Sequence, residues 1–309
     1  MFGVAIQAAD APSAVAQIKQ AEAAGIDAAW ATMGGAGGVD LLPTYAAALV
    51  ATDNIKLGTA IVHTWSRHVL VLAQESLALE QLAPGRFRLG IGPTSAILVN
   101  RMFGMEYRKP LTNLRENLVA IRALLHEGEA DQSGEHVRVR GRLPAKSNVP
   151  VMASALRLKS FDLCGELSDG AISWMCPLGY LSGKAIDALN AGAARAGREA
   201  PPLVAHVPVA VSTDRASVRE KARVQLAMYA RVPNYQGMFA TAGYDVSEGY
   251  SDELLNDLVV SGTEAEVAEG LGRWKEAGMG EILAHPLIEP DDREGSIDSA
   301  FAAVARASK

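Results

Sequence analysis

Short apolar segments alternate with longer helical segments along the 309 residues of the chain. The short segments lack polar alternation, as is typical of parallel strands that are covered on both faces. We expect eight strands, near residues 2–8, 27–32, 55–62, 86–92, 150–154, 169–174, 203–212 and 279–285. We expect helices near residues 12–24, 41–52, 67–82, 110–127, 158–167, 178–197, 214–231 and 292–307. Eight strand–helix units favour a closed (β/α)8 TIM barrel over an open sheet, as a single domain over residues 1–309.

Two insertions interrupt this alternation, one after strand four and one after strand seven. Residues 128–148 are polar, with turn residues at Ser133, Gly134 and Gly141, and they predict a hairpin. Residues 232–262 contain aromatic, glycine and acidic residues. Barrel sites are built from loops at the carboxyl ends of strands, so this second insertion is a candidate lid. The alternative is a surface excursion that thickens the wall or makes a subunit contact.

The composition excludes several classes of function. Apolar residues make up 49% and charged residues 21%, which permits a large core. A net charge of −6 without any basic run argues against nucleic acid or an anionic membrane surface as a partner. The six histidines and two cysteines, Cys164 and Cys176, lack metal-ligand spacing, so we expect no metal. No apolar segment approaches the ~20 residues of a membrane span, and the first residues suit a strand rather than a signal peptide. We therefore expect a cytoplasmic protein with a small-molecule substrate.

Several predicted strand ends carry residues suited to a ligand site. Gly90 and Gly92 lack the third glycine of a dinucleotide fingerprint and precede a proline, so they indicate instead that a ligand or neighbouring backbone comes close. Strand three ends in the small residues Thr59 and Ala60 and is followed by His63 and Trp65. Strand five ends in the small residues Ser154 and Ala155, and strand six ends in Trp174, Met175 and Cys176. Small residues at adjacent strand ends leave room for a flat ring, and the helix N-termini that follow can bind a phosphate. The alternative for each residue is core packing.

The segment from Asp40 to Pro93 resembles the signature of the bacterial luciferase-like monooxygenase superfamily. Its motifs are a T-x-x-I-x-L-G-T strand at 52–59, an Arg67-His68 turn and L-A-P-G-R-F-x-L-G-x-G at 82–92. Further matches occur in order along nearly the whole chain. Within this superfamily, the chain most resembles the deazaflavin-dependent branch, which uses coenzyme F(420), and above all the members that are like methylenetetrahydromethanopterin reductase.

This resemblance implies a β/α barrel, usually homodimeric, that transfers a hydride between reduced coenzyme F(420) and an organic substrate. It places a non-prolyl cis peptide at Ala60-Ile61, behind the cofactor ring. It also assigns two cofactor loops, one of Pro93, Thr94 and Ser95 and one, for the phosphate, of Ser154, Ala155, Leu156 and Arg157. His63 is the histidine that we expect to deliver a proton, although a role in capping the turn after strand three is the alternative. The expected substrate contacts are Thr32, Met33, Trp65, Trp174 and Cys176.

The chain departs from its relatives at three places. Residues 30–35 lack the Asp-His pair that relatives often place after strand two. Thr94-Ser95 replaces a Gly-Glu pair, and Arg157-Leu158 replaces the Gly-Pro of the phosphate loop. These changes argue against the alcohol and sugar-phosphate oxidations of some relatives. Two alternatives therefore stay open: an FMN-dependent monooxygenase supplied by a separate flavin reductase, and a flavin-binding protein without turnover.

The helix predicted at 41–51 is apolar on nearly all sides. One ring of helices cannot bury every side of such a helix. We therefore expect a homodimer that uses this helix together with the neighbouring helix at 69–82.

Overall fold

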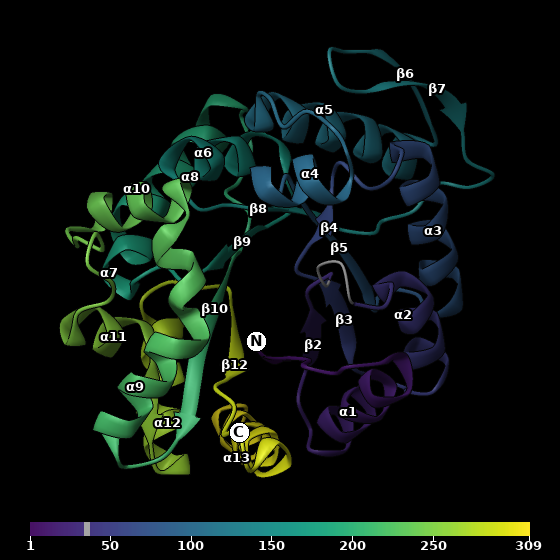
Figure 1. Cartoon of the computed structure of the whole chain (residues 1–309). Helices are drawn as coiled ribbons and strands as arrows, with labels where there is room; N and C mark the ends of the chain where they lie inside the picture. The colour runs from purple at the N-terminus through teal and green to yellow at the C-terminus, as the bar shows by residue number, and fades with distance from the viewer. Residues whose placement is uncertain (34–37) are drawn as a thin grey trace.

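The protein is a closed barrel of eight parallel strands surrounded by helices (Figure 1). The computed structural model describes residues 1–33 and 38–309. The barrel strands are, in order, β1(Phe2–Ala5), β2(Ala28–Ala31), β3(Lys56–Thr59), β5(Phe87–Gly92), β8(Val151–Ser154), β9(Ala171–Trp174), β10(Leu203–Val211) and β12(Glu281–Pro286). Each strand pairs in parallel with the next, and β12 pairs with β1 to close the ring. The predicted barrel is confirmed.

The predicted third strand is interrupted. After β3 the chain passes through Ala60 and Ile61 and resumes as β4(Val62–His63), which pairs with β5. A further short strand, β11(Val260–Gly262), lies on the outer end of β10.

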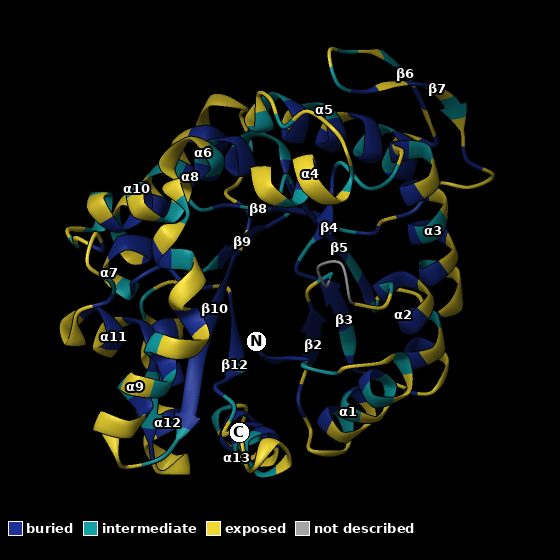
Figure 2. Cartoon of the chain, in the orientation of Figure 1, coloured by how far each residue is buried: buried dark blue, intermediate teal, exposed yellow. Residues whose placement is uncertain are grey.

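Helices cover the outside of the barrel and turn their exposed residues away from the strands (Figure 2). Their bounds are α1(Ala11–Ala23), α2(Leu41–Val50), α3(Val69–Leu82), α4(Ala96–Met102), α5(Pro110–Arg122), α6(Leu158–Leu167), α7(Leu178–Tyr180), α8(Ile186–Arg195), α9(Arg215–Leu226), α10(Pro233–Ala242), α11(Asp252–Leu258), α12(Glu264–Glu276) and α13(Arg293–Ala307). A π-helical turn at Ala123–Glu127 extends α5, and a second at Leu181–Ala185 precedes α8. A 3-10 turn at Ala227–Arg231 follows α9. Within the described residues, no helix is long and apolar enough to cross a membrane.

Four helices, α4, α10, α11 and α12, were not among the expected helical segments. The start of α12 carries a capping box, in which the Thr263 hydroxyl accepts from the Glu266 amide and the Glu266 carboxylate accepts from the Thr263 amide. This arrangement pairs two amides that the first turn of a helix leaves free. The Thr-x-x-Glu pattern in the sequence is therefore the signal that could have located α12.

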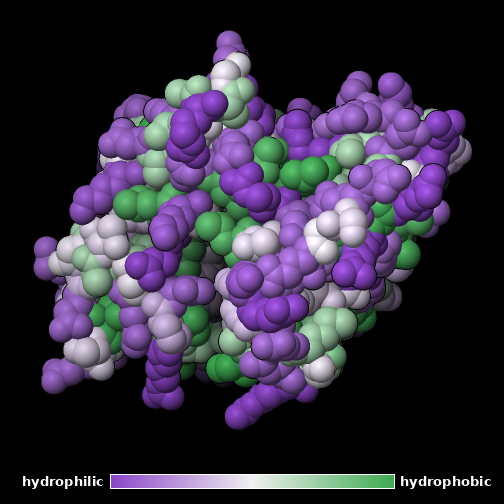
Figure 3. Space-filling model, turned by 90° about the horizontal axis from the view of Figure 1, so that it is seen from above, coloured by the Kyte–Doolittle hydropathy of each residue, from purple (hydrophilic) through white to green (hydrophobic). Residues whose placement is uncertain are grey.

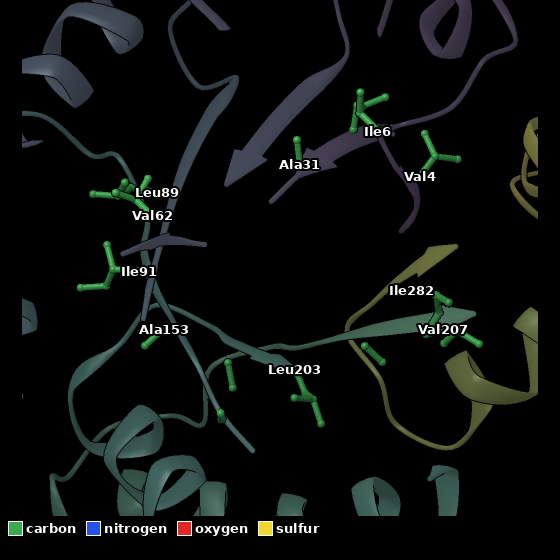
Figure 4. Packing of buried hydrophobic residues seen from close by; sticks show 14 of the residues in the cluster. Val4, Ile6, Ala31, Val62, Leu89, Ile91, Ala153, Leu203, Val207 and Ile282 are labelled. Carbon is green, nitrogen blue, oxygen red and sulfur yellow. The ribbon is translucent and has the colours of Figure 1, made fainter. Parts of the chain in front are cut away.

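The strands separate two cores because successive side chains point to opposite faces. Leu89 and Ile91 lie on the outer side of β5, toward the helices (Figure 4). A smaller cluster fills the barrel interior, with Ala28, Trp30, Ala60, Met152, Ile172, Val204 and Leu283. Bulky layers of this kind make the lower part of the barrel a packed core rather than a channel.

An ion pair crosses the barrel interior below the mouth. Arg88 of β5 bonds to the carboxylate of Glu281 in β12, which also accepts from the Trp30 indole N–H at 2.8 Å. The Arg88 guanidinium lies 4.4 Å from the centroid of the Trp30 ring. Glu281 is only 4% exposed, so the pair is largely removed from water. It ties strands on opposite sides of the barrel to each other.

The first insertion forms the predicted hairpin, β6(Glu129–Ser133) paired with β7(Arg138–Arg142). Its turn contains Gly134, as expected, but the turn expected at Gly141 is wrong. Gly141 lies within β7 opposite Ala130, where a Cβ atom would come 3.2 Å from the Leu70 side chain of α3. The glycine there permits close packing on α3.

The second insertion contains α10, α11 and β11 rather than an open loop. Met238 and Phe239 of α10 and Leu254 and Leu255 of α11 are fully buried in the outer core. In this arrangement the insertion thickens the barrel wall.

Candidate active site at the barrel mouth

The carboxyl ends of all eight strands meet at one end of the barrel, because the strands are parallel. On the third strand, the structure has the expected cis peptide between Ala60 and Ile61. Ala60 is 7% exposed and belongs to the interior cluster, with Ile61 packed against that cluster. The Ala60 amide donates to the Ala31 carbonyl at 2.8 Å, which joins this break to the end of β2. The position predicted for the cis bond is confirmed.

Gly92 and Ser154 bring the ends of β5 and β8 close together. A Cβ atom on Gly92 would lie 2.3 Å from Ser154 Oγ and 3.0 Å from Ile61 Cγ1. A Cβ atom on Gly90 would lie 2.0 Å from the Thr59 carbonyl oxygen. At Gly90 it is therefore neighbouring backbone that comes close. At Gly92 the absent side chain lets the side chains of Ile61 and Ser154 approach the backbone of β5.

The loop after β5 is shaped by Thr94, which has a left-handed backbone with φ of 54°. The Tyr107 hydroxyl donates to the Thr94 carbonyl at 3.2 Å, and the Ser95 hydroxyl caps α4 by accepting from Leu98 N at 3.4 Å. Pro93 precedes Thr94 at the end of β5. These two bonds fix the conformation of the loop. Neither bond joins the Thr94 or Ser95 side chain to a described residue on the other side of the mouth.

Aromatic side chains form the wall next to this loop. The Trp65 ring lies 5.9 Å from the Tyr107 ring and 5.5 Å from the His136 ring of the hairpin turn. The Trp65 indole N–H is buried and has no hydrogen-bond partner among the described residues. The His63 ring lies 6.0 Å from Phe103, at the end of α4. Burial lowers the pKa of His63, so its imidazole is neutral at neutral pH.

The loop after β8 precedes α6 and was expected to bind a phosphate. The amides of Leu156 and Arg157 both donate to the Ser160 hydroxyl, at 3.0 and 3.1 Å. The Ala155 amide donates to the Ile172 carbonyl. An anion here would therefore use the amides of Leu158 and Lys159, which lie in the first turn of α6 and have no carbonyl partner within the helix.

Arg157 connects this loop to the second insertion. Its side chain is exposed and lies over Gly237 of α10, where a Cβ atom would come 2.6 Å from Arg157 Nη1. Arg157 and Lys159 place two cations beside the first turn of α6.

Three rings that include two unexpected histidines occupy the rim of β9, β10 and β12. Trp174, His206 and His285 follow Ile172, Val204 and Leu283 by two residues, so they face the barrel interior one layer closer to the mouth. The Trp174 ring lies 5.7 Å from His206 and 4.7 Å from His285. His206 is 6% exposed, and its Nε2 has no hydrogen-bond partner in residues 1–33 and 38–309.

The two histidines are uncharged at neutral pH. Burial lowers the pKa of His206 to about 3, with a smaller contribution from His285, and lowers the pKa of His285 to about 4. His206 is the one polar residue of the strand LVAHVPVAV, and His285 follows the apolar run ILA in the strand EILAHP, which begins with Glu281. A polar residue within or directly after an apolar run is the sequence signal that could have located each histidine.

Two tyrosines that follow α9 complete this part of the rim. Tyr229, in the 3-10 turn, lies 5.8 Å from Trp174 and 4.9 Å from Tyr235 of α10. Burial raises the pKa of both phenols, so both are protonated at neutral pH. The start of the second insertion thus contributes side chains to the mouth.

We call Trp174, His206 and His285 the rim cluster, and the structure does not bring every expected site residue to it. Thr32 is exposed after β2, and Met33 Sδ accepts from Arg67 Nη1 at 3.6 Å. Cys176 is buried in the outer core, and burial raises the pKa of its thiol. Gly34 and Gly35, which follow Met33, lie outside the described residues.

Two surface clefts lie away from the expected residues. One, of about 410 Å³, opens near the amino ends of the strands beside Met1 and Lys56. The other, of about 730 Å³, lies between Val119 of α5 and the β6–β7 hairpin. Figure 3 looks onto the side where α5 and the hairpin lie, and it shows hydrophobic side chains in patches across a largely hydrophilic face. Among the described residues, no group of three His, Cys, Asp or Glu side chains could hold a metal ion.

These features define a parallel β/α barrel whose mouth is lined by glycine, serine, neutral histidine and aromatic residues, as suits a planar organic ligand. The chain belongs to the luciferase-like monooxygenase family, whose model matches residues 3–281. The expectation of an oxidoreductase from this superfamily is confirmed at the level of the family.

Relatives with assigned names span nearly the whole chain. A 5,10-methylenetetrahydromethanopterin reductase of Methanolobus tindarius is 24% identical over 94% of this chain and 95% of its own length. The structure is similar to the coenzyme F(420)-dependent tetrahydromethanopterin reductase of Methanopyrus kandleri, with a TM-score of 0.80, 21% identity and coverage of 99% and 97%. It is also similar to the oxygenating constituent of 3,6-diketocamphane monooxygenase from Pseudomonas putida, which was solved with FMN, with a TM-score of 0.75, 18% identity and coverage of 100% and 96%. At these identities the two structures support the fold alone.

Proposed function

We propose that this protein transfers a hydride between coenzyme F(420) and an organic substrate at the mouth of the barrel. The observation that carries the proposal is the meeting of three neighbouring strand ends at Ala60-Ile61, Gly92 and Ser154, where the chain has a cis peptide bond, a glycine and the small side chains of Ala60 and Ser154. The named reductase relative of Methanolobus tindarius, aligned over nearly the full length of both chains, supports the deazaflavin as the cofactor.

The described residues fit such a group in two places. Ala60 and Ile61 would support the ring from behind, with Pro93, Thr94 and Ser95 beside it. Ser154, Ala155, Leu156 and Arg157 would lead its phosphate to the first turn of α6, where Arg157 and Lys159 supply positive charge. When bound, coenzyme F(420) would supply or accept the hydride.

The chain's own residues would then position the substrate and exclude water. Thr32, Met33, Trp65 and Trp174 are the proposed contacts, and Cys176 would act only through its packing behind Trp174. His63 is the proposed proton carrier: its neutral imidazole would accept a proton from the substrate, and it would donate one only after taking up a proton itself. A hydride carrier requires precise positioning more than an acid–base pair, so a mouth without an Asp-His pair is compatible with this reaction.

Titration of the purified protein with coenzyme F(420) and with FMN tests the cofactor. We expect at least tenfold tighter binding of coenzyme F(420), a difference of about 1.4 kcal/mol. Equal or tighter binding of FMN would instead favour a two-component monooxygenase served by a flavin reductase, in line with the FMN-bound structural relative. Substrate-dependent bleaching of the bound reduced cofactor would separate either enzyme from a flavin-binding protein without turnover.

We also propose that residues 1–309 form one domain and that the protein acts as a homodimer through α2 and α3. The pairing of β1 with β12 supports the single domain, because the first and last barrel strands complete each other. Exposed apolar residues support the interface: Val50 on α2 is 69% exposed, and Val71 and Leu82 on α3 are 45% and 51% exposed. Burial of these side chains against a second copy would remove them from water.

A further inference from the structure

Three rings at the rim of β9, β10 and β12 contain polar atoms that the described chain does not satisfy. His206 Nε2 and Trp174 Nε1 are both buried without a well-formed hydrogen bond to the described chain, although the Tyr229 hydroxyl approaches the Trp174 indole. Buried polar atoms are nearly always paired, and each exception requires an explanation. Because both side chains face the barrel interior near the mouth, a bound molecule is the explanation that fits their position.

The geometry points to a substrate subsite. We propose that Trp174, His206 and His285 bind an uncharged planar compound that carries a hydrogen-bond acceptor, such as an aromatic ketone or amide. This inference rests on the proposed function, since the bound compound would be the partner in hydride transfer. It adds a chemical class of substrate and two histidines to that proposal.

The hydrogen-bonding chemistry favours an acceptor. An indole N–H can only donate, and a neutral imidazole can donate through one ring nitrogen. The Trp174 and His206 rings meet edge to face with centroids 5.7 Å apart, so one bound group can contact both. A carbonyl oxygen has two lone pairs and can accept from both side chains.

The charge of the rim favours a neutral compound. Neither histidine carries charge at neutral pH, and no ion pair between described residues includes Trp174, His206 or His285. A carboxylate placed here would lose its hydration without meeting a fixed cation, which is costly. A carboxylate beside His206 or His285 would raise the pKa of the histidine and favour uptake of a proton from solvent, and a matched anionic probe tests this alternative.

The surroundings favour a flat compound. Trp174 and His285 are partly exposed, whereas His206, which pairs in register with Trp174, is only 6% exposed, so Trp174 and His285 form the accessible side of the subsite. Tyr229 and Tyr235 form its side at the start of the second insertion. Aromatic rings in these arrangements stack on or meet the edges of a planar ligand.

The test uses the full-length protein with acetophenone and benzoate, which have similar size and differ in charge. Binding is measured by ligand-observed NMR at neutral pH, with and without coenzyme F(420). We expect acetophenone to bind more tightly than benzoate. Trp174→Phe, which keeps the ring and removes the N–H, should weaken acetophenone binding about fivefold, the effect of one lost hydrogen bond.

Trp274→Phe is the matched control, because Trp274 is a buried tryptophan of α12 in the outer core. We expect acetophenone affinity within about twofold of the wild type in this variant, as for a change away from the site. His206→Gln is the second test variant, and thermal unfolding establishes that each variant is folded. If Trp174→Phe does not fold, His206→Gln decides, with a similar weakening expected.

Three results would overturn the inference: no detectable acetophenone binding, equal losses in Trp174→Phe and Trp274→Phe, or benzoate binding as tight as acetophenone. Failure of the proposed function would look different. In that case acetophenone would still bind and depend on Trp174, while the protein would bind neither coenzyme F(420) nor FMN.

Discussion

Replacement of Ala60 by leucine tests whether the third strand forms the wall of a cofactor site. Ala60 is 7% exposed and touches the interior cluster with Trp30 and Ile172, so three added carbon atoms have little free space. If Ala60 only fills a layer of the barrel, overpacking should cost about 1–3 kcal/mol of unfolding free energy. At roughly 2–4 °C per kcal/mol, the melting temperature should then fall by about 2–12 °C.

In a cofactor site the leucine side chain would also occupy the volume of the ring. We then expect the affinity for coenzyme F(420) to fall at least a hundredfold, which corresponds to about 2.7 kcal/mol. Ala28→Leu is the matched control, because Ala28 belongs to the same interior cluster but lies at the start of β2, away from the mouth. Its melting temperature should fall similarly, while its cofactor affinity should change by only a few fold.

The assay measures melting temperature and cofactor affinity on the same preparation of each variant. A loss of stability in Ala60→Leu with affinity within a few fold of the wild type would refute the reasoning. The cofactor would then bind against another part of the rim, and the roles proposed for Ile61, Pro93, Thr94 and Ser95 would fall with it.

Three further predictions concern stability, assembly and pH. Glu281→Ala leaves the Arg88 guanidinium buried without its partner and should cost about 3–5 kcal/mol in denaturant unfolding; a double variant with Arg88→Met should recover part of this loss, and additive effects would contradict the pairing. Light scattering should show a dimer for the wild type and a monomer for Val50→Glu with Leu82→Glu, whereas a wild-type monomer at micromolar concentration would rule out the α2–α3 interface. The pKa of His206 is lowered from 6.5 to about 3, so its stabilising effect is complete above pH 6.5 and is lost as the pH falls below it. Denaturant unfolding should therefore show that His206 lowers the free energy of unfolding by up to about 1.4 kcal/mol for each pH unit below pH 6.5. The pH slope should be smaller in His206→Gln, and an unchanged slope in this variant would contradict the assignment.

The amino-acid sequence determined the architecture because the signals for it are local. Each barrel strand is a short apolar segment between helical segments, and eight such units close a ring by the same repeated step. The hairpin after the fourth barrel strand was predictable for the same reason, since turn residues and polar alternation lie within a few positions of each other. The cis bond at Ala60-Ile61 was located by resemblance, because a conserved arrangement of residues around a strand can be aligned without coordinates.

The rim cluster was decided only by the tertiary structure. His206 and His285 belong to separate strands, and the sequence around each shows only a polar residue in or next to a short apolar run. Their proximity to Trp174 arises because β9, β10 and β12 are neighbours in the closed ring. His206 pairs in register with Trp174, and His285 lies two residues beyond Leu283, the partner of His206 in β12. The loop after β8 shows the same limit, since the sequence predicts a free phosphate loop but only the folded backbone brings the Ser160 hydroxyl to the amides of Leu156 and Arg157. Strand pairing and side-chain direction, which depend on contacts between distant segments, therefore decide which polar atoms are satisfied and which are left for a ligand.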